Sequence, residues 1–177
     1  MHRPDGGEFS PSQFCKNALN MKVLMVCLGN ICRSPLAEGI LRQLTREAGL
    51  AWHVDSAGTG SWHIGQQPDP RSVDIARRHG LDITDQRGRQ FNRKDFERFD
   101  LILTMDQDNY RDVRRLARTE GEREKVQMIM NLVHPGEDRP VPDPYWDDDG
   151  FEQVYRMLEH ACAHLVEQAR NGQLPEG

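Results

Sequence analysis

The sequence predicts an α/β fold of one domain, with a doubly wound parallel sheet of four strands flanked by helices. Short unbroken apolar runs alternate along the chain with segments that carry an apolar stripe at helical spacing. This alternation requires crossover connections and is typical of a parallel sheet with helices on its faces. The length of 177 residues suits one domain with a substantial core, and the sequence contains no internal repeat.

Turn and helix signals set the bounds of the first elements. Residues 23–26 form an unbroken apolar run, which predicts a strand buried on both faces of the sheet. A helix follows the next loop, because Pro35 suits a first helical position, and Gly49 ends it after a continuous apolar stripe. Residues 52–57 predict the second strand. The later elements are a helix at 68–80, a strand at 101–104, a helix at 107–118, a strand at 126–132, a loop at 134–144 and a closing helix after Gly150.

Charge and composition argue against several classes of partner. The formal net charge is -5, so we expect neither nucleic acid nor an anionic membrane as the main partner. No apolar run approaches the roughly 20 residues needed to cross a bilayer, and the first residues lack the apolar core of a secretory signal. The four cysteines show no paired metal-ligand spacing, so we expect reduced thiols, no metal, no cofactor and a cytoplasmic location.

Composition also sets the expected domain boundaries. Residues 1–20 are polar and rich in Gly, Pro and Ser, which predicts a flexible N-terminal extension. Residues 21–172 form the expected folded domain, and 173–177 form a short tail.

The segment from Cys27 to Arg33 is the strongest candidate for chemistry. It lies where the first predicted strand ends and a helix begins, and doubly wound sheets bind ligands at the carboxyl ends of their strands. Backbone N–H groups that lead into a helix N-terminus form an anion site. Gly29 and Asn30 tolerate the left-handed backbone angles that turn such groups inward. The pattern predicts a loop that binds a dianionic phosphate, and its other members are Leu28, Ile31, Cys32 and Ser34.

Cys27 and Arg33 have complementary chemistry in such a loop. A guanidinium can hold two phosphate oxygens at once, whereas a lysine supplies only a point charge. The same positive environment favours the thiolate form of Cys27, which would then attack phosphorus. The ordinary alternative for a Cys-x5-Arg match is a core thiol and a surface arginine. The preceding strand and the Ser-Pro helix start argue against that alternative.

A proton donor for the leaving oxygen is predicted in the proline-rich loop. Asp143 lies between Pro142 and Pro144, which stiffen the backbone on both sides of it. A carboxyl group held in this way can meet a substrate oxygen and act as a general acid. The alternative is an ordinary Asp-Pro turn without a chemical role.

Three aromatic side chains on loops are candidates for a substrate pocket. Aromatic walls suit a flat phenyl ring, and the candidates are Trp62, Tyr145 and Trp146. Simple packing is the alternative for each of them. The acidic run at 147–149 is interpreted as solvated surface and as capping of the closing helix.

Together these residues resemble the low-molecular-weight protein tyrosine phosphatase family. The segment V-C-L-G-N-I-C-R-S-P at 26–35 is similar to that family's phosphate-binding loop. D-P-Y at 143–145 and F-E-x-V-Y at 151–155 are similar to its acid loop and closing helix. Four shorter motifs follow the same order: D-S-A-G-T at 55–59, P-D-P-R at 68–71, R-H-G at 78–80 and T-M-D at 104–106. The resemblance covers about residues 21–170 and implies a protein-tyrosine phosphatase that needs no metal.

The resemblance implies a role for each catalytic candidate. Cys27 would form a phosphocysteine intermediate, and Arg33 would bind the phosphate and the transition state. Asp143 would protonate the tyrosine oxygen and then activate water. Ser34 would hydrogen-bond the Cys27 sulfur, and Asn30 would hold the shape of the loop.

Further roles follow from the same resemblance. Ser56 and His79 are implied as outer supports of the loop, although a structural or helix-end role is equally expected for His79. Cys32 is implied as a redox partner that pairs reversibly with Cys27, with simple packing as the alternative. The pocket walls fall on the three aromatic candidates, but Trp146 stands where a second tyrosine is common. Residues 1–20 have no counterpart in the family core.

Two other functions are weighed against the phosphatase. A thiol-dependent arsenate reductase shares this fold but needs a relay of cysteines, and the sequence has no cysteine between 33 and 161. A non-catalytic phosphoprotein-binding module would need neither a thiolate nor an acid. The resemblance implies a phosphotyrosine-containing protein as the partner, with a tyrosine kinase as one example, and the expected state is a monomer or weak dimer.

Overall fold

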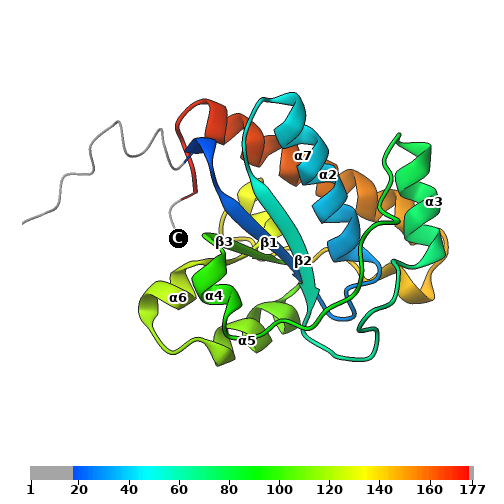
Figure 1. Cartoon of the computed structure of the whole chain (residues 1–177), viewed down its shortest axis with the longest axis horizontal. Coiled ribbons are helices and arrows are strands. Elements are labelled where there is room, and N and C mark those ends of the chain that lie inside the picture. Colours follow the sequence, from blue (N-terminus) through cyan, green and yellow to red (C-terminus); the bar gives the residue numbers. More distant parts are fainter. Residues whose placement is uncertain (1–17, 176–177) are drawn as a thin grey trace, which may run out of the picture.

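The computed structural model describes residues 18–175 of the chain. At its centre lies a four-stranded parallel sheet with the strand order β2-β1-β3-β4. Helices flank the sheet on both sides (Figure 1). The predicted α/β class is therefore confirmed. Most of the expected extension at 1–20 and the last two residues of the expected tail lie outside the described residues.

Three strands form where the apolar runs predict them. β1 spans Lys22–Cys27, β2 spans His53–Gly58 and β3 spans Leu101–Thr104. β1 pairs with β2 on one side and with β3 on the other. Its apolar residues 23–26 are fully buried, as expected for a central strand covered on both faces.

The fourth strand is shorter than the sequence predicts. β4 covers only Val126–Met128, and Ile129–Leu132 form a short 3-10 helix, η1. The prediction of a strand up to residue 132 is therefore wrong. The apolar side chains of η1 are buried like those of a strand, and periodicity cannot separate the two in so short a run.

The helices begin and end at local signals that the sequence carries. α2 ends before Gly49, whose φ of 70° suits a residue without a side chain. The short helices α4 and α6 were not expected, because four or five residues give no full amphipathic repeat. The helices are α2 at Arg33–Glu47, α3 at Pro70–Arg78, α4 at Asp95–Arg98, α5 at Gln107–Leu116, α6 at Glu120–Glu124 and α7 at Gly150–Arg170.

Acidic side chains cap two of the helices next to the carboxyl ends of the strands. The Asp69 carboxylate accepts from the backbone N–H of Arg71 at the start of α3. The Asp106 carboxylate accepts from the backbone N–H of Asn109 at the start of α5. Asp149 stands at the N-cap of α7 but makes no capping hydrogen bond with its side chain, so the capping expected from the acidic run is not found there.

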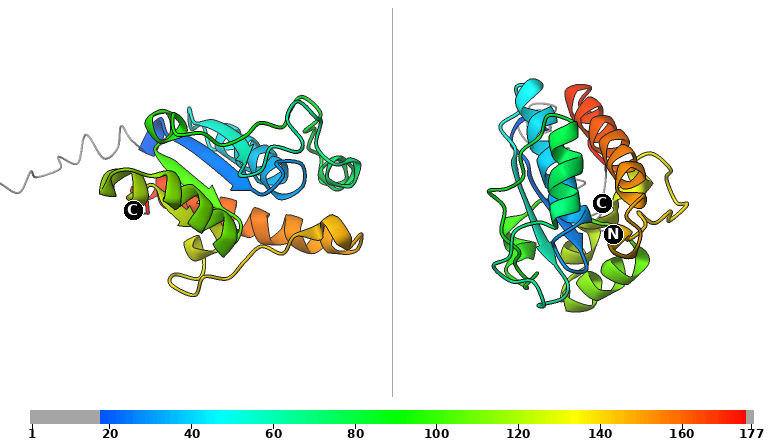
Figure 2. Two further views of the ribbon diagram at one scale, coloured as in Figure 1. Left: turned by 90° about the horizontal axis from the view of Figure 1, so that it is seen from below. Right: turned by 90° about the vertical axis from the view of Figure 1, so that its right-hand side faces the viewer.

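The sheet separates two hydrophobic cores. Alternate residues of β1 face opposite sides, with Met25 in the core beneath α2 and α7 and Leu24 in the core beneath α4 and α5. α7 lies alongside α2 over one face of the sheet, whereas α4, α5 and α6 lie on the other side (Figures 1 and 2). This arrangement leaves the carboxyl ends of the strands free to carry loops.

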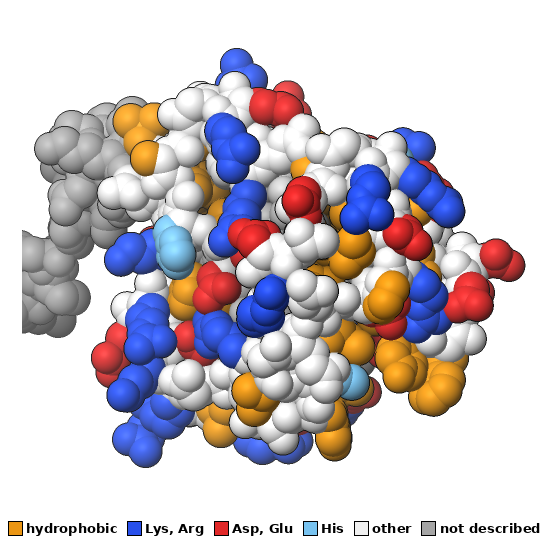
Figure 3. All heavy atoms as spheres, turned by 45° about the vertical axis from the view of Figure 1, so that its right-hand side comes forward, with side chains coloured by type: hydrophobic (Ala, Val, Ile, Leu, Met, Phe, Trp, Pro, Cys, Tyr) orange, Lys and Arg blue, Asp and Glu red, His pale blue; other side chains and the backbone are white. Residues whose placement is uncertain are grey.

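The first described residues pack against the domain. The carbonyl oxygen of Ala18 accepts from the Trp52 indole, and that of Leu19 accepts from the Ala51 backbone N–H. Acidic and basic side chains are interspersed over the face of the molecule in Figure 3, and hydrophobic side chains lie among them in several places. Between residues 18 and 175, no helix is both long and apolar enough to cross a bilayer.

Candidate active site

The turn between β1 and α2 forms a compact loop that starts at Cys27 and ends at Arg33. Asn30 adopts the left-handed conformation with φ of 57°, as the sequence predicted, whereas Gly29 does not have a positive φ, so the prediction is wrong for Gly29. The end of β2 approaches the loop very closely at Gly58. A side-chain carbon at that position would lie 2.7 Å from the Leu28 carbonyl oxygen, so this close approach requires a glycine.

Cys27 is buried, and two groups of its own loop bind its sulfur. The Ser34 hydroxyl lies 3.0 Å from Cys27 Sγ, and the Asn30 backbone N–H donates to the same sulfur over 3.3 Å. The sulfur at the end of β1 is therefore held between two polar groups that surround it.

Asn30 connects the loop to its surroundings. Its Nδ2 donates to Ser34 Oγ at 2.8 Å and to Ser56 Oγ at 2.9 Å, and its Oδ1 accepts from the Arg89 backbone N–H at 3.0 Å. These contacts support the expected roles of Asn30 and Ser56. Since each bond satisfies a buried polar group, the network fixes the conformation of the loop.

Glu38 extends this network into α2. The Ser56 hydroxyl donates to Glu38 Oε2 at 2.5 Å, and the Arg42 guanidinium lies 3.0 Å from Glu38 Oε1. Burial raises the pKa of Glu38 from 4.5 to about 7, although the Ser56 hydrogen bond and Arg42 act in the opposite direction. Glu38 is therefore a buried acid that titrates close to neutral pH.

Arg33 is buried and held by groups from two other segments. Its Nη1 donates to Asp106 Oδ2 at 2.7 Å and to the Val141 carbonyl at 3.0 Å, and its Nη2 lies 3.5 Å from Asp143 Oδ2. Burial opposes the charged form, but Cys27 and the two carboxylates raise the pKa of Arg33 above its usual range. The guanidinium is therefore a fixed cation beside the sulfur.

Asp143 reaches the same place from the proline-rich loop. It precedes η2, a 3-10 helix at Pro144–Trp146, and its Oδ1 accepts from the Tyr145 backbone N–H at 3.1 Å. Its side chain is 41% exposed, so solvent or a ligand in the cavity can reach the carboxyl group.

One cavity of about 230 Å³ collects the predicted site residues. Its floor is the loop from Cys27 to Arg33, and Asp143 lies at its side. Trp62 and Trp146 stand largely exposed on its rim, and Tyr145 meets Trp146 edge to face with ring centroids 4.8 Å apart. The predicted nucleophile, cation, acid and aromatic walls therefore line a single cavity.

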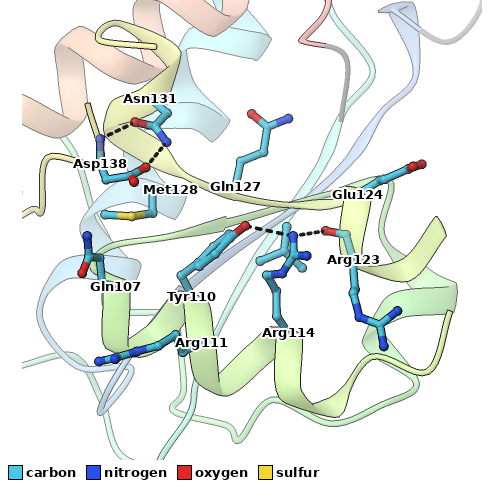
Figure 4. Close-up of a pocket in the computed structure, with 11 residues that line it drawn as sticks. Gln107, Tyr110, Arg111, Arg114, Arg123, Glu124, Gln127, Met128, Asn131 and Asp138 are labelled. Carbon is cyan, nitrogen blue, oxygen red and sulfur yellow. Dashed lines mark hydrogen bonds between the residues drawn. The ribbon is translucent and has the colours of Figure 1, made fainter. Parts of the chain in front are cut away.

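A larger groove of about 510 Å³ has a different character. It lies between α5 and β4, where Arg114 donates to the Tyr110 hydroxyl at 2.9 Å and to the Arg123 carbonyl at 3.3 Å (Figure 4). Asn131 and Asp138 bind each other on its other side (Figure 4). None of the predicted site residues lines this groove. The smaller cavity at Cys27 is therefore the candidate active site.

Comparison with known proteins bears on this site. The family model of the low molecular weight phosphotyrosine protein phosphatases matches residues 22–173. The chain belongs to this family. A low molecular weight phosphotyrosine protein phosphatase of Drosophila melanogaster is 39% identical over 163 residues, which cover 90% of this chain and 98% of the relative.

Solved structures agree with this membership of the low molecular weight phosphatase family. A protein tyrosine phosphatase from Entamoeba histolytica has a TM-score of 0.80 at 37% identity, covering 87% of this chain and 99% of that structure. A structure described as a Drosophila arginine phosphatase has a TM-score of 0.78 at 36% identity, covering 84% of this chain and 97% of that one.

His79 and Cys32 are two further residues that the sequence predicted as part of the site. His79 ends α3, where its ring stacks on Tyr155 and its Nε2 lies 3.1 Å from Glu152. Its contacts therefore lie away from the loop, and the alternative of a structural histidine at a helix end describes it. Cys32 lies in the loop, but burial, followed by the charge of Asp69, raises the pKa of its thiol to about 12.

Sequence reasoning missed several residues of the site. Asp106 and the pair Asp69 and Arg71 lie in the motifs T-M-D and P-D-P-R, to which no role had been given. Glu38 is buried although it lies outside the apolar stripe of α2, so the sequence carries no clear signal for its role. His63 also lines the cavity and is the fifth site residue that the sequence did not predict. Within residues 18–175, no group of three His, Cys, Asp or Glu side chains is placed to hold a metal ion.

Proposed function

We propose that the protein is a protein-tyrosine phosphatase that hydrolyses phosphotyrosine through a phosphocysteine intermediate at Cys27. The observation that carries the proposal is the shared cavity of the Cys27 sulfur, the Arg33 guanidinium and the Asp143 carboxyl group. The proposed catalytic domain is 21–172, which agrees closely with the matched family region at 22–173.

In the first step, the phosphate dianion binds the backbone N–H groups of the loop and the fork of Arg33. The Cys27 thiolate attacks phosphorus, so that a P–S bond forms while the P–O bond to the aryl group breaks. Asp143, in its acid form, gives its proton to the leaving phenolate oxygen. The 3.5 Å between Asp143 Oδ2 and Arg33 Nη2 supports this role, because it holds the acid next to the bound phosphate.

In the second step, the Asp143 carboxylate takes a proton from water as that water attacks phosphorus. The P–S bond breaks, phosphate leaves and the thiolate returns. The Ser34 hydroxyl, 3.0 Å from Cys27 Sγ, stabilises the departing sulfur anion. The loop and Arg33 supply the positive charge for both steps, so we propose that no metal takes part.

The rim of the cavity supports an aromatic phosphate ester as substrate. Trp62, Tyr145 and Trp146 can enclose a phenyl ring. We further propose that the substrate is a phosphotyrosine-containing protein in the cytoplasm, such as a tyrosine kinase, and that the enzyme acts as a monomer or weak dimer.

We also propose Cys32 as the thiol that pairs with Cys27 after oxidation. Loss of thiol-dependent recovery from peroxide in Cys32→Ser would support that pairing.

The proposed function is tested by turnover of p-nitrophenyl phosphate in the presence of EDTA. Cys27→Ser should abolish turnover, and Asp143→Ala should lower it about 100-fold or more while vanadate still binds. Cys162→Ala and Asp149→Ala are the matched controls, since neither residue lines the cavity. Cys162 is fully buried in α7 next to the Ala37 carbonyl of α2, and Asp149 is an exposed aspartate six positions after Asp143.

A trapping experiment separates the other candidate functions. Asp143→Ala, mixed with substrate and quenched, should carry phosphate on Cys27, which peptide mass spectrometry can map. Full turnover by Cys27→Ser would contradict the mechanism. Loss of turnover when EDTA is added to the unaltered protein would also contradict it. Binding without turnover would indicate a binding module, and thiol-dependent reduction of arsenate would indicate a reductase. Phosphoarginine and phosphotyrosine peptides, tested side by side, decide between the activities named for the related structures.

A further inference from the structure

We propose that Arg71 is a positioning residue that ties the acid loop to the phosphate-binding loop, so that proton transfer from Asp143 depends on it. The proposal rests on the proposed function and assigns to Arg71 a role in that chemistry without contact to the reacting atoms. It is carried by a continuous chain of hydrogen bonds between the two loops.

The far end of this chain lies directly after Asp143. Arg71 Nη1 donates to the Tyr145 carbonyl oxygen at 3.0 Å and to Asp148 Oδ1 at 2.5 Å. The guanidinium carbon also lies 5.5 Å from the centre of the Tyr145 ring and 4.8 Å from that of Phe151. One side chain therefore holds η2 and the segment that follows it.

The near end lies on the phosphate-binding loop. Arg71 Nε and Nη2 donate to the two carboxylate oxygens of Asp69, each at 3.0 Å. The Asp69 backbone N–H donates to the Ile31 carbonyl at 2.8 Å, and the Ser72 hydroxyl donates to the Cys32 carbonyl at 3.2 Å. The start of α3 is thus fixed to the loop that carries Cys27.

The charges of this tie are matched. The hydrogen bond from Arg71 holds the pKa of Asp69 below its usual value. Asp148 lies in the acidic run and is exposed, as the sequence suggested, and it is also an ion-pair partner of Arg71. A planar guanidinium can serve both carboxylates and the carbonyl at once, which a lysine ammonium cannot do with the same geometry.

Asp143 needs such a tie because its loop is anchored by few other contacts. On the upstream side, the Val141 carbonyl accepts from Arg33, and the Val141 N–H donates to the Met105 carbonyl at 2.8 Å. On the downstream side, within the described part of the chain, Arg71 makes the hydrogen bonds that reach residues 145–149 from another element. The Asp143 carboxyl group also contacts Arg33 at 3.5 Å and the Tyr145 N–H at 3.1 Å. Without Arg71, these contacts would remain, but the segment after Asp143 would lose its hydrogen bonds to α3.

Loss of this positioning role should change the dependence of the rate on the leaving group, which a merely structural role would not do. General acid catalysis typically contributes about 10²–10⁴-fold, and it requires close positioning of the acid. A leaving group that is already a weak base needs no proton, so it is insensitive to a misplaced acid. Loss of the tie should therefore slow cleavage of poor leaving groups selectively and leave phosphate binding unchanged.

The test compares phenyl phosphate, a poor leaving group, with 2,4-dinitrophenyl phosphate, a good one. The measured quantity is kcat/KM, which reports the steps up to loss of the leaving group. Arg71→Ala should lower kcat/KM about 10-fold or more for phenyl phosphate and less than about threefold for the dinitrophenyl ester. The inhibition constant of vanadate should change less than about twofold.

Further variants keep the test independent of folding. Arg71→Lys keeps the charge but loses the fork, and it should show an intermediate loss. Asp148→Asn weakens only the far end of the tie and should show a smaller loss of the same selectivity. Arg77→Ala is the matched control, because this exposed arginine of α3 pairs only with Asp74 at 3.7 Å among the described residues. Melting temperatures establish that each variant is folded.

A double-mutant cycle decides whether Arg71 acts through Asp143. In the Asp143→Ala background, Arg71→Ala should lower phenyl phosphate hydrolysis less than about twofold further, since the two changes act on one function. A full additional loss in that background, or an equal loss for both esters, would overturn the role of Arg71 while leaving the proposed function intact. Absence of turnover by the unaltered protein would overturn both.

Discussion

At the scale of single residues, the site keeps a charged arginine out of water. The Arg33 side chain is 3% exposed and lies 2.7 Å from the Asp106 carboxylate. Removing one partner of a buried pair leaves the other charge without compensation, which costs far more than a surface pair contributes. Asp106 therefore holds Arg33, the proposed phosphate-binding cation, in place.

Substitution of Asp106 tests this role. Asp106→Ala should lower the free energy of unfolding by about 3 kcal/mol, because Arg33 loses its partner and α5 loses its cap. Asp106→Asn keeps a capping acceptor and should lose less stability, but it should weaken vanadate binding about as much. Urea unfolding and vanadate inhibition measure the two effects. An unchanged inhibition constant in both variants would contradict the role.

Glu38 predicts a pH dependence of stability. Its pKa is about 7 in the folded protein and 4.5 as its ordinary value. Between these values the folded chain keeps a proton that the unfolded chain has lost, so this group's contribution to stability falls as pH rises from about 4.5 to 7.

The substitution Glu38→Gln removes this titration and keeps an acceptor for Ser56. Relative to the unaltered protein, it should gain up to about 3 kcal/mol between pH 5 and pH 8, at 1.36 kcal/mol for each pKa unit. Urea unfolding at both pH values measures the change. A difference that stays constant with pH would show that Glu38 titrates normally.

At the scale of elements, the loop from Cys27 to Arg33 depends on a network that reaches beyond its own residues. Asn30 bonds to Ser34 in α2, to Ser56 in β2 and to the backbone of Arg89. It does so from a left-handed conformation, which a residue with a side chain adopts only at a cost of about 1 kcal/mol. The loop is therefore held by its neighbours and is not a stable turn by itself.

Two substitutions separate backbone conformation from hydrogen bonding at Asn30. Asn30→Ala should lower stability by about 2–3 kcal/mol, since it loses the network and keeps the strain. Asn30→Gly should recover about 1 kcal/mol of this loss, because glycine adopts the left-handed conformation freely. Both should weaken vanadate binding. Thermal unfolding distinguishes them, and equal stability of the two variants would argue against strain.

Much of the fold and part of the site could be predicted from the sequence at this scale. β1, β2, β3 and the long helices follow from apolar runs and stop signals that act over neighbouring residues. Cys27 and Arg33 lie in one short loop, so their spacing alone suggested a joint role. Asp106 could not be assigned, because its contact with Arg33 joins residues 73 positions apart. Arg71 reaches Asp148 over 77 positions in the same way.

At the scale of the whole molecule, the site is assembled from segments that lie far apart in the sequence. The loop after β1, the start of α3, Asp106 at the start of α5 and the acid loop all meet at the carboxyl ends of the strands. A ligand that bridges these segments stabilises the folded chain as a whole, since it binds only when they are together.

Ligand binding should therefore raise the stability of the entire domain. Vanadate at about 100 times its dissociation constant should add about 2.7 kcal/mol to the free energy of unfolding. Differential scanning calorimetry measures the accompanying rise in melting temperature. Arg33→Ala should show no rise at the same concentration. A rise of equal size in that variant would place the bound anion elsewhere.

The exposed indole of Trp146 makes the acid loop visible to fluorescence. Its side chain is 91% exposed and stands three positions after Asp143, whereas Trp52 is partly covered and bonded to Ala18. An indole in water emits at longer wavelength than a covered one, so a ligand that covers Trp146 should shift its emission toward the blue. Replacing Trp62 by phenylalanine would simplify the spectrum, and rapid mixing could then follow substrate arrival in real time without a dye.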